Sequence, residues 1–157
     1  MAKNSNMEKQ YAEIKKKYNL PEFVKIDKEL ELSDLEDTNF LLRAIIRRIA
    51  EKLDFCATLL EEILQPDTSS LYAIHETRAF DEDEKKRMYD LYSRLMSYSR
   101  HSIEVSLSLD EAKSSEFISS FVDEWEILRE EIMDFVKQMR ESWKIEADIK
   151  EDLGYLG

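Results

Sequence analysis

Residues 34–65 read DLEDTNFLLRAIIRRIAEKLDFCATLLEEILQ, and this stretch decides the fold. Apolar side chains recur in it at alternating steps of four and three residues, the spacing that places side chains on one face of an α-helix. A second apolar row widens this into the broad face of a helix that packs in a core. The first row consists of Leu42, Ile46, Ile49, Leu53, Cys56, Leu60 and Ile63, and the second of Leu41, Ile45 and Leu59.

Residues 111–148 show the same spacing, so they predict a second long core helix. Residues 82–108 predict a third, although Ser99, Ser102 and Ser106 stand among its apolar positions. A serine hydroxyl inside a helix can donate to the carbonyl one turn earlier, so we expect these serines to allow close helix packing. The apolar row of 111–148 consists of Ile118, Phe121, Trp125, Leu128, Ile132, Phe135 and Met139.

Glycine occurs only at Gly154 and Gly157. Sheet hairpins and phosphate-binding loops need glycine, so the composition disfavours both. The sequence therefore predicts an all-α fold, an antiparallel helical bundle that forms a single domain over residues 1–157. The expected elements are three long helices at about 34–65, 82–108 and 111–148, an N-terminal helix at about 5–18, an extended linker at 19–32 and a short capping helix at about 68–79.

Four helix starts carry capping signals. Ser33 and Glu36 have the spacing of a capping box, in which each side chain accepts a backbone N–H near the helix start. Asp67, Asp81 and Asp110 each precede a helical pattern, as N-cap residues do.

The formal net charge is −12, and residues 110–157 hold most of the excess, with 14 acidic and 6 basic side chains. Such a field repels nucleic acid as a whole and favours basic partners or simple solubility, so we expect no nucleic-acid partner. A weaker interpretation makes residues 110–134 an acidic mimic of nucleic acid. Arg43, Arg47, Arg48 and Lys52 lie on one side of the helix expected at 34–65, where we expect them to pair with acids or remain solvated.

The chain has no stretch long and apolar enough to span a membrane, and its single cysteine, Cys56, cannot form an internal disulfide. We therefore expect a cytoplasmic protein without membrane contact. His75 and His101 lack an acidic residue three positions earlier, so the helical di-metal pattern is absent, and we expect no metal and no cofactor.

The last long helix is expected to extend past its neighbours, and its apolar pattern continues there. An uncovered apolar patch marks an interaction surface, so we expect this end to bind a protein partner or a second copy. The alternative is that the N-terminal helix folds back over it. The expected surface consists of Met139, Trp143, Ile145, Ile149, Leu153, Tyr155 and Leu156.

Arg94 and His101 lie seven residues apart, a spacing that puts both on one face of the helix expected at 82–108. This Arg-x6-His pattern resembles the Arg-x4–6-His motif of the HEPN superfamily, small all-helical domains of which many are ribonucleases that act as dimers. The resemblance implies that His101 would activate a ribose 2′-hydroxyl and that Arg94 would stabilise the phosphate transition state. Leu95 departs from the pattern, because active members usually have a polar residue there.

The leading functional hypothesis is a non-enzymatic cytosolic interaction module that uses the end of its last helix. The alternative is a HEPN-like RNA-cleaving or RNA-binding domain that uses Arg94 and His101. The sequence assigns no catalytic residue under the leading hypothesis.

Overall fold

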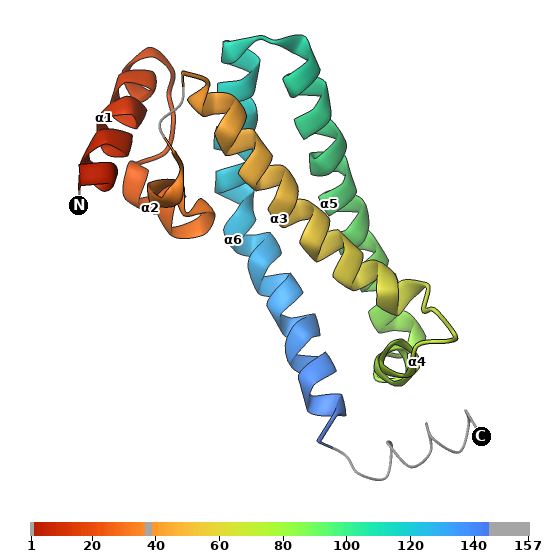
Figure 1. The fold of residues 1–157 in the computed structure, drawn as a ribbon. Helices are drawn as coiled ribbons and strands as arrows, with labels where there is room; N and C mark the ends of the chain where they lie inside the picture. Colours follow the sequence, from red (N-terminus) through yellow and green to blue (C-terminus); the bar gives the residue numbers. More distant parts are fainter. Residues whose placement is uncertain (1, 37–38, 145–157) are drawn as a thin grey trace. The chain divides into compact units, whose positions relative to one another are not determined.

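A computed structural model describes residues 2–36 and 39–144, with side chains from Asn6 onward. The described residues form α-helices and one short 3₁₀ helix, η1, with no strand among them, which confirms the expected all-α helical bundle (Figure 1). The helices are α1 (Ala2–Lys17), α2 (Phe23–Leu30), η1 (Leu32–Asp34), α3 (Leu41–Leu64), α4 (Leu71–Thr77), α5 (Glu82–Ser108) and α6 (Glu111–Ser142).

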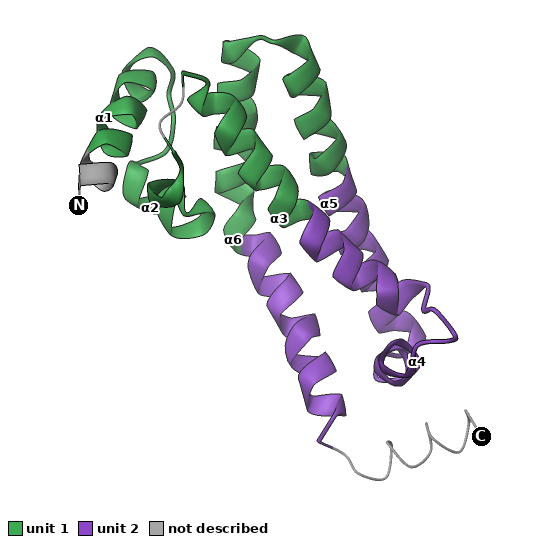
Figure 2. Cartoon of the chain, in the orientation of Figure 1, with its two compact units in different colours: residues 1–53, 97–126 green, residues 54–96, 127–157 purple. Residues whose placement is uncertain are grey.

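The chain divides into two compact units (Figure 2). Unit 1 consists of Met1–Leu53 and Ser97–Glu126, and unit 2 of Asp54–Met96 and Ile127–Gly157. The three long helices α3, α5 and α6 each contribute to both units, as the two colours along them show. The expectation of a single domain remains a prediction.

Unit 1 has an aromatic core. Phe117, Phe121 and Trp125 of α6 stack in succession, and Tyr98 of α5 packs its ring edge-on against Phe121. Trp125 donates its indole N–H to Glu29 of α2 at 2.8 Å, which joins the N-terminal segment to this core. The aromatic side chains of the predicted apolar row therefore do pack inward.

Two expectations for residues 19–40 are wrong. The linker expected at 19–32 contains α2, which buries Ile26 and Leu30. The long helix expected from residue 34 begins only at Leu41, with the backbone N–H of Ala44 bonded to the carbonyl of Phe40. Ser33 forms no capping box there, because its N–H and hydroxyl both donate to the Asp27 carboxylate, at 2.8 and 2.6 Å.

Unit 2 is held together around the short helix α4. Thr77 donates its hydroxyl to the carbonyl of Ile63 in α3 at 2.7 Å. Phe80 packs edge-on against Phe135 of α6, and Gln138 donates to the carbonyl of Ala79 at 3.0 Å. These contacts fix α4 and the turn that follows it against the ends of two long helices.

The predicted helix starts are correct at Asp81 and Asp110 and wrong at Asp67. Asp81 and Glu84 form a reciprocal capping box, and Asp110 accepts from the backbone N–H groups of the first turn of α6. Asp67 instead accepts from the backbone and hydroxyl of Ser69, and the cap of α4 is Ser70. A capping side chain was predicted at the right turn but three residues too early.

The serines of α5 behave as expected. Ser102 donates to the carbonyl of Ser99 at 2.6 Å, and Ser106 to that of Ser102 at 2.8 Å. Both hydroxyls are therefore satisfied inside their own helix.

None of the described helices is long and apolar enough to cross a membrane.

Candidate protein-interaction surface

Unit 1 contains a cavity of about 390 Å³ at the turn between α5 and α6. Its walls come from the end of α1, the start of α3, the end of α5 and the start of α6. This volume falls within the range of natural small-ligand pockets, near its lower limit. The apolar wall residues are Ile14, Phe40, Leu41, Leu42, Ile46, Val105 and Leu109.

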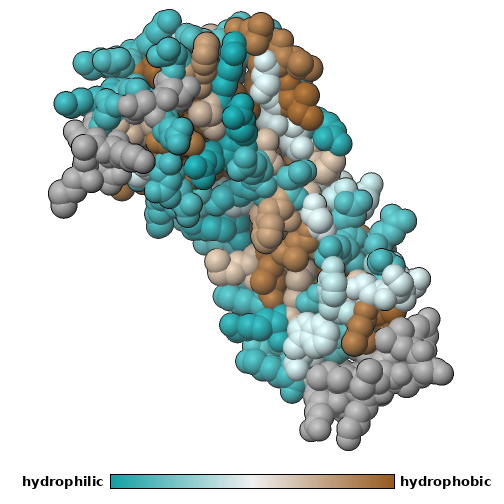
Figure 3. All heavy atoms as spheres, in the orientation of Figure 1, coloured by the Kyte–Doolittle hydropathy of each residue, from teal (hydrophilic) through white to brown (hydrophobic). Residues whose placement is uncertain are grey.

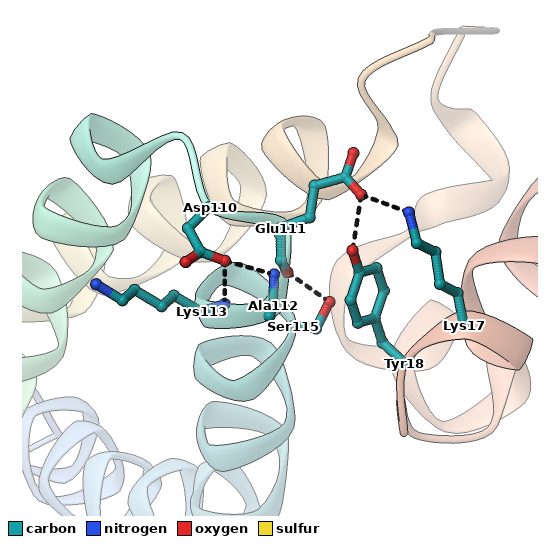
Figure 4. A network of polar contacts seen from close by, with 7 residues as sticks. All are labelled: Lys17, Tyr18, Asp110, Glu111, Ala112, Lys113 and Ser115. Carbon is teal, nitrogen blue, oxygen red and sulfur yellow. Dashed lines mark hydrogen bonds and ion pairs between the residues drawn. The ribbon is translucent and has the colours of Figure 1, made fainter.

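Lys17, Tyr18 and Glu111 line this cavity and form a polar network (Figure 4). The Glu111 carboxylate accepts the Tyr18 hydroxyl at 2.8 Å and the Lys17 ammonium at 3.4 Å. The hydrogen bond from Tyr18 and then that from Lys17 lower the pKa of Glu111, and the bond to Glu111 raises the pKa of Tyr18. Asp110 fixes the start of α6 beside this network by accepting from the N–H groups of Ala112 and Lys113.

Leu109 makes the turn from α5 to α6 with a positive φ of 57°. Glycine adopts this left-handed conformation without cost, whereas the Cβ of other L-residues is crowded by the following carbonyl. The side chain of Leu109 nevertheless projects into solvent, 69% exposed. An exposed leucine is thus held where glycine would be the easier residue.

Two more large apolar side chains are exposed next to this turn, Ile103 and Leu107, which lie one helical turn apart on α5. Leu107 is 78% exposed. We name Ile103, Leu107 and Leu109 the hairpin-tip surface. Figure 3 shows hydrophobic atoms gathered over the end of α5 and its turn to α6.

Three exposed arginines of unit 1 stand on the two helices α3 and α5, which contribute to the cavity. Arg43 lines the cavity together with Leu109 and lies over the Phe40 ring, 4.8 Å from its centroid. Arg47 follows one turn later on α3, and Arg100 lies on the same face of α5 as Ile103 and Leu107 by helical spacing. Within the described residues, Arg43, Arg47 and Arg100 form no ion pair.

The basic residues expected to pair or to stay solvated thus divide in two. Lys52 lies 3.9 Å from the carboxylate of Glu29 and over the Trp125 ring, so it belongs to the core contact of α2. Arg43 and Arg47 are exposed, so their charge is available at the surface.

The interaction surface expected at the end of the last helix stays a prediction, because the structure describes only two of its seven residues, Met139 and Trp143. Met139 is buried, so it cannot offer a contact. Trp143 stacks on His75, 4.0 Å between ring centroids, and donates its indole N–H to Glu76 at 3.1 Å. The other expected members, Ile145, Ile149, Leu153, Tyr155 and Leu156, lie outside the described residues.

The alternative, in which the N-terminal helix covers the end of the last helix, stays a prediction, because most of the residues to be covered lie outside the described part of the chain. The end of α1 contacts the start of α6, where Lys17 and Tyr18 meet Glu111. The carbonyl of Asn19 accepts the Ser119 hydroxyl at 3.0 Å in the same region. The N-terminal segment therefore packs beside the cavity of unit 1.

Arg94 and His101, the pair of the HEPN resemblance, have different surroundings. Arg94 in unit 2 makes a two-fold contact with the Glu131 carboxylate, and its Nε lies 3.6 Å from Asp90. His101 in unit 1 packs edge-on against Phe117, with 5.0 Å between ring centroids. An arginine paired with two carboxylates is poorly placed to stabilise a phosphate.

The remaining side chains that could act in catalysis or metal binding, a histidine and a cysteine, are buried inside the fold. His75 is buried, and its Nε2 lies 3.0 Å from the carbonyl of Ser142. Cys56 is buried, as expected for a residue of the apolar row. Within the described residues, no group of three or more His, Cys, Asp or Glu side chains could hold a metal ion.

No protein-family model matches the chain, and searches of curated proteins and of solved structures return no significant match. Function therefore has to be inferred from the surface itself. Sequence reasoning missed the hairpin-tip surface because apolar residues near a predicted turn look like helix ends. The available signal was that Leu107 and Leu109 fall at a turn without glycine.

Proposed function

We propose that this protein is a non-enzymatic protein-interaction module whose contact surface is the hairpin-tip surface, Ile103, Leu107 and Leu109. The observation that carries the proposal is the exposed Leu109 side chain on a left-handed backbone. Residues in sparsely populated backbone conformations cluster at functional sites, so this exposed leucine supports a role in contact.

Burial gives these side chains their value in binding. Removing a leucine side chain from water contributes about 1.5–3 kcal/mol, so three neighbouring apolar side chains can form the central contact of an interface. Arg43, which lines the cavity together with Leu109, favours specificity, because charges at a rim select partners more than they add affinity. The lone cysteine favours the cytosol as its location.

Two matched variants test the proposal, Leu107→Ser and Val24→Ser. Both residues belong to unit 1, and they are almost equally exposed at 78% and 79%. A photo-crosslinking residue at position 104 of each protein would label bound partners in cells. We expect Leu107→Ser to lose the labelled partners and Val24→Ser to keep them. Equal labelling of both variants and the unchanged protein would contradict the proposal.

A further inference from the structure

We propose that the hairpin-tip surface and its arginines bind residues 145–157 of a second copy of this chain. The inference rests on the proposed function, because it names the partner of that same surface. It makes the protein a self-associating module in which each copy offers one surface and one segment.

The arginines and residues 145–157 carry opposite charges. Arg43, Arg47 and Arg100 carry three positive charges without an ion pair among the described residues, in a chain of net charge −12. Residues 145–157 carry the opposite sign, with four acidic side chains and one lysine. Opposite charges at the edges of an apolar contact guide encounter and fix its register. The acidic residues of the segment are Glu146, Asp148, Glu151 and Asp152.

Residues 145–157 also have an apolar pattern at helical spacing. Ile145, Ile149 and Leu153 recur every four residues, a spacing that gives one apolar stripe when such a segment docks as a helix. The cavity of about 390 Å³ beside Leu109 is large enough to take an aliphatic side chain. The segment thus combines the apolar and acidic chemistry that this surface is suited to bind.

Chain length favours a second copy over the same chain. The cavity lies at the start of α6, where Glu111 and Ser114 line it, and α6 has 32 residues, which is roughly 48 Å of helix. Residues 145–157 span at most about 45 Å when fully extended. A segment of the same chain would need its full extended length to run back along α6 to the cavity. None of its apolar residues would then remain to dock there.

A reciprocal exchange of segments between two copies gives a closed dimer. Two copies that each give a segment and receive one form a two-fold dimer, in which both surfaces are used and no further copy is recruited. Ion pairs at the rim are screened by salt, so the dimer should weaken between low and moderate ionic strength.

Light scattering on the purified full chain tests the inference. We expect a dimer for the unchanged protein and a monomer at the same concentration for the chain that ends after Lys144. Arg47→Glu should weaken the dimer about tenfold, because an attraction becomes a repulsion. Lys16→Glu makes the same charge change at another exposed position of unit 1 and should leave the dimer intact.

A rescue experiment separates a direct contact from a general charge effect. Chains with Arg47→Glu and chains with Asp148→Lys, mixed in equal amounts, should restore dimers, since both exchanged contacts of a mixed pair then join opposite charges. A monomeric full chain, or a dimer that survives removal of residues 145–157, would overturn the inference. Neither result touches the proposed function, which fails only when Leu107→Ser keeps every partner that the unchanged protein binds.

Discussion

Leu109 and Glu31 are the non-glycine residues with positive φ among the described residues, at 57° and 54°. Both are exposed, so a glycine at either position would remove backbone crowding and cost little packing. We expect Leu109→Gly and Glu31→Gly each to raise the free energy of unfolding by about 0.5–1 kcal/mol, after the added freedom of the unfolded chain is subtracted. Urea unfolding measures both.

The two glycine variants should differ in binding. Only Leu109→Gly removes a side chain of the hairpin-tip surface, so it should gain stability and lose partner binding, whereas Glu31→Gly gains stability alone. A Leu109→Gly protein that binds as before would show that the strained leucine has no role in contact.

Tyr11 links stability to alkaline pH. Its side chain is buried, its hydroxyl donates to the carbonyl of Pro21 at 2.5 Å, and burial, followed by the nearby charge of Glu22, raises its pKa. A group whose pKa is raised by folding stabilises the native state below its unfolded pKa, and this contribution is lost as pH rises above about 10. Stability should therefore fall between roughly pH 9 and 11, and fall less steeply in Tyr11→Phe.

Urea unfolding across this pH range gives the slope of stability against pH for both proteins. The slope is the informative quantity, because Tyr11→Phe also removes a hydrogen bond and lowers stability at every pH. Identical slopes would rule out Tyr11 as a source of the alkaline loss.

At the scale of single helices, capping can be tested at two sites that look alike in sequence. Asp81 and Glu84 form the capping box of α5, with Asp81 accepting at 2.8 Å and Glu84 at 3.1 Å. Asp81→Ala should cost about 1 kcal/mol. Glu36 was expected to complete a similar box with Ser33, but Ser33 contacts Asp27 instead, so Glu36→Ala should change stability by less than about 0.5 kcal/mol. Thermal unfolding of both variants checks this contrast.

The helices that sequence predicted best are those with a cap next to a long apolar row. The start of α5 after Asp81 and the start of α6 after Asp110 both follow from the sequence. The start of α3 does not follow from the sequence. Ser33 donates to the Asp27 carboxylate and does not cap a helix that starts after it. The helix α2 was missed since its eight residues are too few for the period to stand out.

At the scale of the whole molecule, the end of α6 contributes to unit 2. Ser142 and Trp143 contact His75 and Glu76 of α4 through a carbonyl, a ring stack and an indole N–H. A chain that ends after Arg140 should still fold but lose about 2 kcal/mol, or roughly 5 °C in Tm. A chain that ends after Lys144 keeps these contacts, and at a concentration where the full protein is monomeric it should have the same Tm as the full protein.

Calorimetry on the two truncated proteins compares these effects directly. If both melt at the temperature of the full chain, the contact of Trp143 with α4 contributes nothing to unit 2. If the chain that ends after Lys144 is less stable than the full chain at a concentration where both are monomers, residues 145–157 are part of the folded core, and our interpretation of them as a docking segment is wrong.

The sequence by itself determined the all-α fold, because a chain with glycine only at 154 and 157 and with apolar rows at helical spacing can bury its core only by packing helices. It also determined that Cys56 and the row around it face inward. The tertiary structure alone decided which apolar side chains stay in water: Met139, at the end of its apolar row, is covered, whereas Leu107 of α5 is not. The spacing of residues along one helix determines which side chains share a face. Whether that face is exposed depends on which other elements pack against it, and contacts between residues distant in the sequence determine this packing.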